Sequence, residues 1–177
     1  MSEGAGGGIE FRRFIRDVPD FPKPGILFRD VTPLLLAPEA LRAAAAAIAA
    51  PHLGAGIERV LGVESRGFLF GAPVALELGA GLVPVRKAGK LPAATLGVDY
   101  QLEYGSDRLE VHADALRPGQ RVLVVDDLLA TGGTAAASIA LAQRCGAEVV
   151  GCAFLIELAD LQGRTRLSAP VHSVIRY

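Results

Sequence analysis

The sequence is poor in the features that mark membrane proteins, secreted proteins and nucleic-acid-binding domains. No window contains the roughly 18 apolar residues of a membrane-spanning helix, and the N-terminal stretch MSEGAGGGIE has neither the positive segment nor the apolar core of a signal peptide. The net charge of −1 argues against a general nucleic-acid binder, whose domain is normally clearly basic. We therefore expect a cytoplasmic protein with no membrane partner and no nucleic-acid partner.

Cysteine and histidine are also scarce. Cys145 and Cys152 fall in an expected helix and an expected buried strand, where a thiol is more often a small core residue than half of a disulfide or metal pair. The three histidines, His52, His112 and His172, form no spaced set. The sequence therefore does not predict metal binding by histidine or cysteine.

The chain is rich in apolar residues. Hydrophobic residues make up 51% of its 177 positions, which excludes disorder of the chain as a whole. A chain of this length is one domain in the simplest case and is large enough for a proper core. We expect a single domain over residues 1–177, with the glycine-rich residues 1–8 as a flexible tail.

Apolar runs alternate with helical patterns along most of the chain. After a helical turn or two within residues 11–17, helices are expected over 38–50, 68–79 and 135–145, the first of them starting at a proline. Strands are expected over 57–63, 81–85, 121–125 and 149–156, with an edge strand over 171–177. This alternation predicts an α/β fold, an open parallel sheet with right-handed crossovers and helices on both faces.

Two segments break the alternation. Residues 18–28, VPDFPKPGILF, contain three prolines and must be extended or turning. Residues 91–109 are polar and rich in turn formers, and such a long excursion is typical of an active-site lid. Residues 108–112 are expected to pair back as a short strand.

The most informative stretch is RVLVVDDLLATGGT, residues 121–134. Its apolar run suits a strand buried on both faces of a parallel sheet, and we expect the strand to end at the acidic pair Asp126–Asp127. The small residues 130–134 then open an alanine-rich helix. Backbone N–H groups of such a loop close on a phosphate, and the helix dipole favours negative charge. Neighbouring carboxylates hold sugar hydroxyls, Mg²⁺ or both, so the pattern indicates a sugar-phosphate site.

Each half of this motif also has a purely structural interpretation. Adjacent aspartates after a strand often cap a helix or a turn, and Gly-Gly often only forms a turn. The complete pattern, a hydrophobic strand followed by Asp-Asp-x-x-Ala-Thr-Gly-Gly-Thr, resembles the signature of the phosphoribosyltransferases that use phosphoribosyl pyrophosphate (PRPP). The signature does not indicate which base is used.

Basic residues follow two of the other expected strands. Ligands of open parallel sheets bind beyond the carboxyl ends of the strands. Arg66 follows the first expected strand, and Arg86 and Lys87 follow the second. A single cation is usually a solvated surface charge, but three of them facing an acidic pair and a phosphate loop suit a polyanion that chelates Mg²⁺. PRPP has the matching parts: a 5′-phosphate, ribose hydroxyls and a pyrophosphate.

Further blocks narrow the resemblance. FPKPGILFRDVTPLL, ESRGFLFG, RKAGKLP, LEYG, VVDDLLATGGT and the IEL around Glu157 occur in this order, and together they resemble the adenine phosphoribosyltransferases. The family often has Asp where this chain has Glu64, a change that keeps the charge. The resemblance implies the type I phosphoribosyltransferase fold with a mobile lid loop and an N-terminal hood segment. It also implies Mg²⁺ as cofactor, adenine and PRPP as substrates, AMP and pyrophosphate as products, and a homodimer.

The resemblance also assigns the residues that would bind PRPP. Asp126 and Asp127 are expected to hold the ribose 2′- and 3′-hydroxyls close to the reacting carbon. Mg²⁺ is expected to arrive with PRPP, with no certain direct protein ligand and with either aspartate as a contact through water. The 5′-phosphate is expected to lie among Ala130, Thr131, Gly132, Gly133 and Thr134. The pyrophosphate is expected to contact Arg66, Arg86, Lys87 and Lys90, some of them from the other subunit.

The adenine site is implied in the same way. Phe28 is expected to stack on the base, with Leu158 on its opposite face and the backbone near Leu27 and Arg29 reading the 6-amino edge. Glu103, on the lid, is the candidate for catalytic proton handling at the imidazole ring. From pattern alone, the phenylalanine and Leu158 are core residues, Glu103 is a solvated loop charge, and Arg29 forms a surface ion pair with Asp30 that contributes little.

Two other functions compete with this interpretation. A non-catalytic PRPP sensor on the same fold would keep the phosphate loop but could dispense with the lid carboxylate, the pyrophosphate cations and the base pocket, all of which have candidates here. A transferase acting on a 6-oxopurine or on xanthine would need a hydrogen-bond donor where adenine needs an acceptor. Backbone donors and acceptors cannot be told apart from the sequence.

Overall fold

The computed structural model describes residues 9–101 and 106–177. They divide into two compact units, one ending at Ala44 and one running from Ala45 to Tyr177. Helix α2 (Pro38–Ala49) spans the boundary and is followed by the 3₁₀ helix η2 (Ala50–His52), so the helix expected over 38–50 is confirmed. The expectation of one domain over the whole chain stays a prediction.

The first unit contains a short β-hairpin. The 3₁₀ helix η1 (Phe11–Phe14) leads into β1 (Arg16–Pro19), which pairs antiparallel with β2 (Leu27–Asp30). Proline occurs at the end of β1 and in the turn, where its missing N–H breaks no ladder hydrogen bond. Helix α1 (Thr32–Leu36) follows the hairpin. The proline-rich segment is therefore extended and turning, as expected, but the pairing of its two arms and the helix after it were not predicted.

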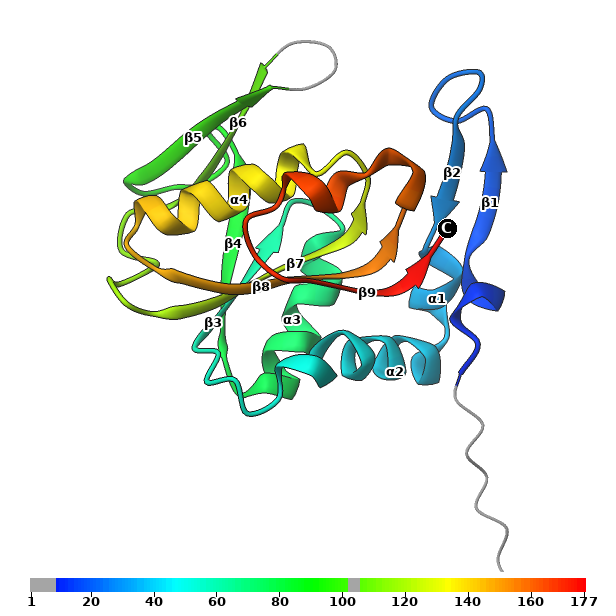
Figure 1. The fold of residues 1–177 in the computed structure, drawn as a ribbon, viewed down its shortest axis with the longest axis horizontal. Coiled ribbons are helices and arrows are strands. Elements are labelled where there is room, and N and C mark those ends of the chain that lie inside the picture. The colour runs from blue at the N-terminus through cyan, green and yellow to red at the C-terminus, as the bar shows by residue number, and fades with distance from the viewer. Residues whose placement is uncertain (1–8, 102–105) are drawn as a thin grey trace, which may run out of the picture. The chain divides into compact units, whose positions relative to one another are not determined.

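The second unit is built on a seven-stranded sheet of order β5-β6-β4-β3-β7-β8-β9 (Figure 1). Five strands are parallel: β3 (Arg59–Val63), β4 (Gly81–Lys87), β7 (Arg121–Leu129), β8 (Glu148–Glu157) and β9 (Val171–Arg176). The strands β5 (Thr95–Gln101) and β6 (Ser106–His112) add to one side antiparallel. All five expected strands are present, and β9 lies at the edge as expected.

The helices lie on opposite faces of this sheet because the chain leaves two neighbouring strands in opposite directions. Helix α3 (Gly67–Leu78) carries the chain from β3 to β4, and α4 (Gly133–Arg144) carries it from β7 the other way to β8. Right-handed crossovers in opposite directions place their helices on opposite faces. The expected α/β sheet with helices on both faces is confirmed. The 3₁₀ helices η3 (Ala159–Leu161) and η4 (Gly163–Arg166) connect β8 to β9.

Two expectations about secondary structure near the site were wrong. The stretch 91–109, expected to be rich in turns, is largely strand, since β5 and β6 pair from Thr95↔His112 to Gln101↔Ser106; its role as a lid stays a prediction. The central strand does not end at Val125 but runs to Leu129, because it stays paired with β8 as far as Leu129↔Glu157. The acidic pair therefore lies within the carboxyl-terminal part of β7 and not after it.

Helix α3 approaches the sheet closely through glycine. A Cβ built on Gly71 would lie 3.1 Å from the Cα of Gly62 in β3 and 3.3 Å from the Leu82 side chain. A separate core cluster packs between the sheet and α4, and it includes the fully buried Leu61, Val124 and Phe154. Cys152 is a free thiol within this core, as expected. No helix of the described segments is both long and apolar enough to cross a membrane.

We predict that Gly71→Val lowers the free energy of unfolding by about 1–3 kcal/mol, because the added methyl groups have no space between α3 and β3. Chemical denaturation measures this. The matched control is Glu77→Val, at an exposed position of the same helix. This variant should change the free energy of unfolding by no more than about 0.5 kcal/mol, as is usual for surface substitutions. Equal destabilisation by both variants would contradict the close packing.

Candidate active site

The carboxyl ends of β3 and β7 border a crevice. These neighbouring strands send the chain in opposite directions, and ligands of open α/β sheets bind at such a switch point. A cavity of about 490 Å³ opens there, lined by Glu64, Ser65, Arg66, Lys87, Asp126, Asp127, Leu128 and Thr134. Two of the predicted cations and both aspartates therefore share one cleft, although they come from three different strand ends.

A smaller hollow of about 90 Å³ adjoins this cleft and contains the predicted phosphate loop. It is lined by Asp126, Leu128, Leu129, Ala130, Thr131, Gly132, Gly133, Thr134, Ala135 and Phe154. Gly132 is the N-cap of α4 and has φ 82°, a left-handed conformation that favours glycine. The first turn of α4 thus borders a polar hollow at the positive end of its dipole, an arrangement that binds anions.

The two aspartates lie in different environments. Asp127 is 4% exposed, and one of its oxygens accepts a hydrogen bond from Nε of Arg66 at 2.5 Å. Its backbone N–H donates to Oδ1 of Asp126 at 2.8 Å. Burial raises the pKa of Asp126 well above its ordinary value, and the neighbouring Asp127 charge raises it further. A Cβ on Gly67 would lie 2.7 Å from that Asp126 oxygen, so glycine at the start of α3 leaves room for the carboxylate.

Glu64 organises the cations at the end of β4. Its carboxylate accepts hydrogen bonds from the backbone N–H of Lys87 at 3.0 Å and from Nε of Arg86 at 3.2 Å. Desolvation raises the pKa of Glu64, but these bonds outweigh it and the net shift is downward. Arg86 also donates to the Lys90 carbonyl at 3.0 Å. In the sequence, Glu64 was noted only as a position where the family often has Asp. Its hydrogen bonds to Lys87 and Arg86 at the end of β4 were not predicted.

A second carboxylate missed by the sequence analysis, Asp107 of β6, reaches Lys87. The Lys87 ammonium lies 3.2 Å from Asp107, and the hydrogen bond between them raises the pKa of Lys87. The Tyr100 hydroxyl donates to the same carboxylate at 3.5 Å, and it also hydrogen-bonds to Thr134. The hairpin of β5 and β6 is thus joined to both sides of the cleft. Only its register, which pairs Tyr100 with Asp107, brings these groups together.

Not every predicted residue lines this cleft. Arg86 and Lys90 line a separate, mostly apolar groove of about 420 Å³ with Phe68, Ala72, Leu82, Pro84, Leu91 and Pro92. Leu158 directly follows β8, where its N–H donates to the Leu129 carbonyl at 2.9 Å. Glu103 lies outside the described residues. The roles assigned to these residues stay predictions.

The predicted base-stacking residues belong to the hairpin of the first unit. Leu27, Phe28 and Arg29 are consecutive residues of β2, and the Phe28 ring packs edge-on against Phe21 with centroids 5.1 Å apart. Arg29 forms an ion pair with Asp17 across the hairpin; the alternative pairing with Asp30 is not tested.

The fold also brings two histidines together that the sequence left unrelated. The rings of His52 and His172 have centroids 6.4 Å apart, although 120 positions separate them in the chain. Burial lowers the pKa of His52, and the neighbouring ring lowers it further. Across residues 9–101 and 106–177, no group of three or more histidine, cysteine or carboxylate side chains is placed to hold a metal ion.

We predict that Asp126→Asn raises the free energy of unfolding at pH 7 by about 1 kcal/mol, because it removes a desolvated charge and keeps the Oδ1 acceptor. A raised carboxylate pKa costs stability as pH rises from the unfolded pKa through the folded pKa. The gain should therefore vanish at pH values below the ordinary aspartate pKa. Denaturant titrations across pH measure it. The exposed Asp114→Asn is the control; a less stable Asp126→Asn at pH 7 would refute the desolvation argument.

Comparison with known proteins agrees with this geometry. A family model described as a phosphoribosyl transferase domain matches residues 33–176. The chain is 56% identical over 170 residues to the adenine phosphoribosyltransferase of Rhodopirellula baltica, covering 96% of this chain and 82% of that protein. The crystal structure of the Rhodothermus marinus adenine phosphoribosyltransferase superposes with a TM-score of 0.90 at 57% identity, covering 94% of this chain and 96% of that one. The Saccharomyces cerevisiae enzyme, in complex with an imino-altritol bisphosphate and adenine, gives a TM-score of 0.89 at 41% identity over 93% and 96% of the two chains. This chain belongs to the adenine phosphoribosyltransferase family.

Proposed function

We propose that this protein transfers the 5-phosphoribosyl group of PRPP to adenine, forming AMP and releasing pyrophosphate, as a step of purine salvage. The observation that carries the proposal is the single cleft at the switch point, in which Arg66 and Lys87 face Asp126 and Asp127 beside the loop at the start of α4. The close relatives named adenine phosphoribosyltransferase support the same reaction.

PRPP is proposed to bind along this cleft, with its 5′-phosphate at one end, its ribose in the middle and its pyrophosphate at the other end. Its 5′-phosphate lies in the hollow of residues 130–134 at the positive end of the α4 dipole. The ribose hydroxyls bond to the carboxylates of Asp126 and Asp127. The pyrophosphate lies toward Arg66 and Lys87, which in the structure are paired with Asp127 and Asp107. A polyanion exchanges these ion pairs for contacts with its own oxygens.

The reaction forms a bond from adenine N9 to ribose C1′ and breaks the bond from C1′ to a pyrophosphate oxygen. Positive charge develops on the sugar in the transition state, and the carboxylates of the two aspartates would stabilise it. The basic groups stabilise the departing pyrophosphate. The N9 proton must leave adenine, and Glu103 is our candidate to accept it.

Magnesium fits this donor set as an ion carried by the substrate. Mg²⁺ binds through one or two carboxylates, substrate phosphates and several waters, and seldom in a cage made only of protein ligands. Three carboxylates line the cleft, those of Glu64, Asp126 and Asp127, but no three histidine, cysteine or acidic side chains of the described residues are grouped to hold a metal ion. Asp126 or Asp127 would hold the hydrated ion, directly or through water. The ion supplies charge neutralisation of the pyrophosphate as it leaves.

For the base, Phe28 is proposed as the stacking residue and the backbone near Leu27 and Arg29 as the groups that read its 6-amino edge, with Leu158 as a further contact. The complex of the yeast relative with adenine supports this choice of base. The cytoplasm is the proposed compartment, and it agrees with the two free cysteines, Cys145 and Cys152.

The test is pyrophosphate release from PRPP and Mg²⁺ with adenine, hypoxanthine, guanine or xanthine offered separately. We expect release with adenine and little with the others, because a site that accepts a hydrogen bond from the 6-amino group leaves that acceptor unpaired against a 6-oxo group. The control is the double variant Asp126→Asn/Asp127→Asn, which should bind PRPP at least about tenfold more weakly through loss of charge-assisted hydrogen bonds. Release with a 6-oxopurine alone would reassign the base, and PRPP binding without release would indicate a sensor.

We also propose that two copies associate through the outer face of α3 and β4. Leu76 and Leu69 of α3 are 83% and 47% exposed, and Leu82 of β4 is 38% exposed. Leu82 lines the mostly apolar groove that Arg86 and Lys90 also line, and so does Ala72, one helical turn before Leu76. A contiguous exposed apolar surface of this kind marks an interface. A second copy on this face would lie beside these two cations, in keeping with pyrophosphate contacts contributed by the other subunit.

We predict that Leu76→Glu converts the dimer to a monomer, because the substitution would bury a charge in the interface. Sedimentation equilibrium measures the mass in solution. The matched control is Leu53→Glu, at a leucine that is 61% exposed outside α3 and β4, which should leave the dimer intact. A wild-type monomer, or a Leu76→Glu dimer of unchanged stability, would refute the interface.

A further inference from the structure

The back of the phosphate loop lies directly against another turn. A Cβ on Gly132 would lie 2.5 Å from the Gly163 carbonyl oxygen, and a Cβ on Gly163 would overlap the Ala130 carbonyl oxygen and lie 2.9 Å from the Gly132 nitrogen. Gly163 is buried. The backbones of the two turns are therefore in contact with no side chain between them, and the position of one fixes the position of the other.

The residue after Gly163 ties this turn to the sheet. The Arg164 guanidinium makes two hydrogen bonds to the Glu157 carboxylate, at 3.0 Å from Nε and 2.5 Å from Nη2. Its remaining terminal nitrogen, Nη1, donates to the Val171 carbonyl at 2.6 Å. Glu157 is the last residue of β8 and Val171 the first of β9. Arg164 thus holds η4 to two strands at once with the planar fork that only arginine offers.

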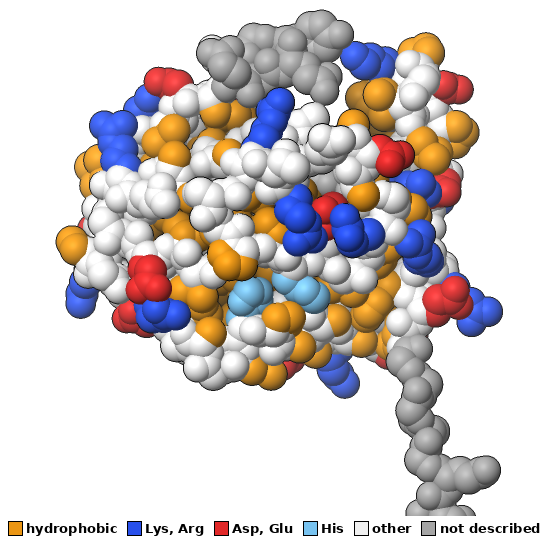
Figure 2. All heavy atoms as spheres, in the orientation of Figure 1, with side chains coloured by type: hydrophobic (Ala, Val, Ile, Leu, Met, Phe, Trp, Pro, Cys, Tyr) orange, Lys and Arg blue, Asp and Glu red, His pale blue; other side chains and the backbone are white. Residues whose placement is uncertain are grey.

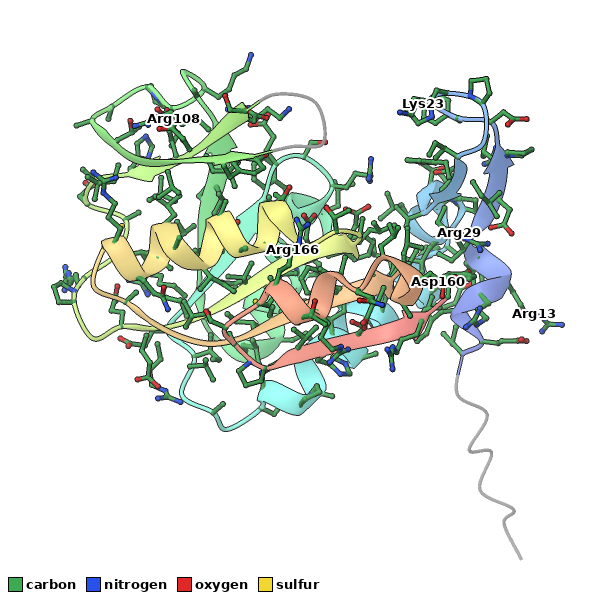
Figure 3. The ribbon with its side chains drawn as sticks, turned by 45° about the horizontal axis from the view of Figure 1, so that its top comes forward. Arg13, Lys23, Arg29, Arg108, Asp160 and Arg166 are labelled. Carbon is green, nitrogen blue, oxygen red and sulfur yellow. The ribbon has the colours of Figure 1, made fainter. Side chains whose placement is uncertain are left out.

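Burial makes this ion pair hard to replace. The Glu157 side chain is 3% exposed, and a buried carboxylate that loses its partner is strongly disfavoured. Arg176 lies farther from it, at 3.4 Å. In Figure 2 basic side chains, with an acidic one between them, gather over η4 and the end of β9. Arg166, on the same turn and labelled in Figure 3, is exposed and makes no contact of this kind.

We propose that Arg164 is a positioning residue for the 5′-phosphate site: by fixing Gly163 against Ala130 and Gly132, it holds the loop's N–H groups in the orientation that binds phosphate. This inference rests on the proposed function and adds to it a residue that touches no substrate. A site whose groups are already oriented avoids the entropic cost of ordering them on binding. Arg66 and Lys87 lie on the other side of the crevice, on the connection after β3 and the end of β4, so the pyrophosphate contacts do not depend on this turn.

The experiment compares Arg164→Met with wild type by calorimetry and steady-state kinetics. We expect Kd for ribose 5-phosphate and KM for PRPP to rise by about tenfold, in line with the loss caused by removing outer supporting partners of a binding site. Affinity for magnesium pyrophosphate, KM for adenine and kcat at saturating PRPP should stay within about twofold. Arg164→Lys, which keeps the charge but not the fork, should restore part of the affinity.

The matched control is Arg166→Met, which removes the same charge from the same turn and should leave both affinities unchanged. The proposal is overturned if Arg164→Met binds ribose 5-phosphate as wild type does, if pyrophosphate affinity falls as much, or if Arg166→Met has the same effect. If the wild-type protein binds neither PRPP nor ribose 5-phosphate, the proposed function is refuted, and this inference with it.

A second variant covers the case in which Arg164→Met does not fold. Gly163→Ala leaves the ion pair in place but forces the turn away from the loop. It should lower the affinity for ribose 5-phosphate and leave the affinity for magnesium pyrophosphate unchanged. Its control is Gly151→Ala, whose Cβ would lie 3.1 Å from the His52 ring, away from the loop. That variant should lower stability without changing either affinity, and equal affinity losses in both glycine variants would count against the positioning role.

Discussion

The site depends on the fact that the chain leaves the neighbouring parallel strands β3 and β7 toward opposite edges of the sheet. Because one strand leads to β4 and its neighbour to β8, the two connections separate and leave a crevice at the carboxyl ends of the strands. Arg66 follows β3, and the two aspartates lie in the carboxyl-terminal part of β7. A right-handed crossover on each side then sets the start of α3 and the start of α4 at the borders of the crevice.

Two cations of this crevice are held by carboxylates. Arg66 bonds to Asp127, and Lys87 bonds to Asp107. These ion pairs fix the orientation of both side chains, and a site with ordered side chains loses less entropy on binding. Burial makes the charge of Asp126 costly. A site that keeps a costly charge gives up stability for function, a common compromise in binding and catalytic sites.

Some of the site could be predicted because its chemistry is local in the sequence. Residues 121–134 form strand, carboxylates, loop and helix start without a break, so periodicity and glycine placement were sufficient to find them. The end of β7 was misplaced because pairing with β8 outweighed the local signal of two charged residues. Asp107 and Arg164 were missed because their partners, Lys87 and Glu157, come close only when strands and turns assemble.

The sequence by itself determined the five parallel strands, the helices α2, α3 and α4, the glycine-containing loop 130–134 and the acidic pair, because each depends on side-chain periodicity and backbone preference over a few neighbouring residues. Tertiary structure alone decided which charges meet: Lys87 lines the cleft while Arg86, its neighbour in the chain, lines a separate groove. Successive residues of a strand point to opposite faces, and strand register then selects the partner of each. Such long-range pairings are set by packing, which no local stretch of sequence encodes.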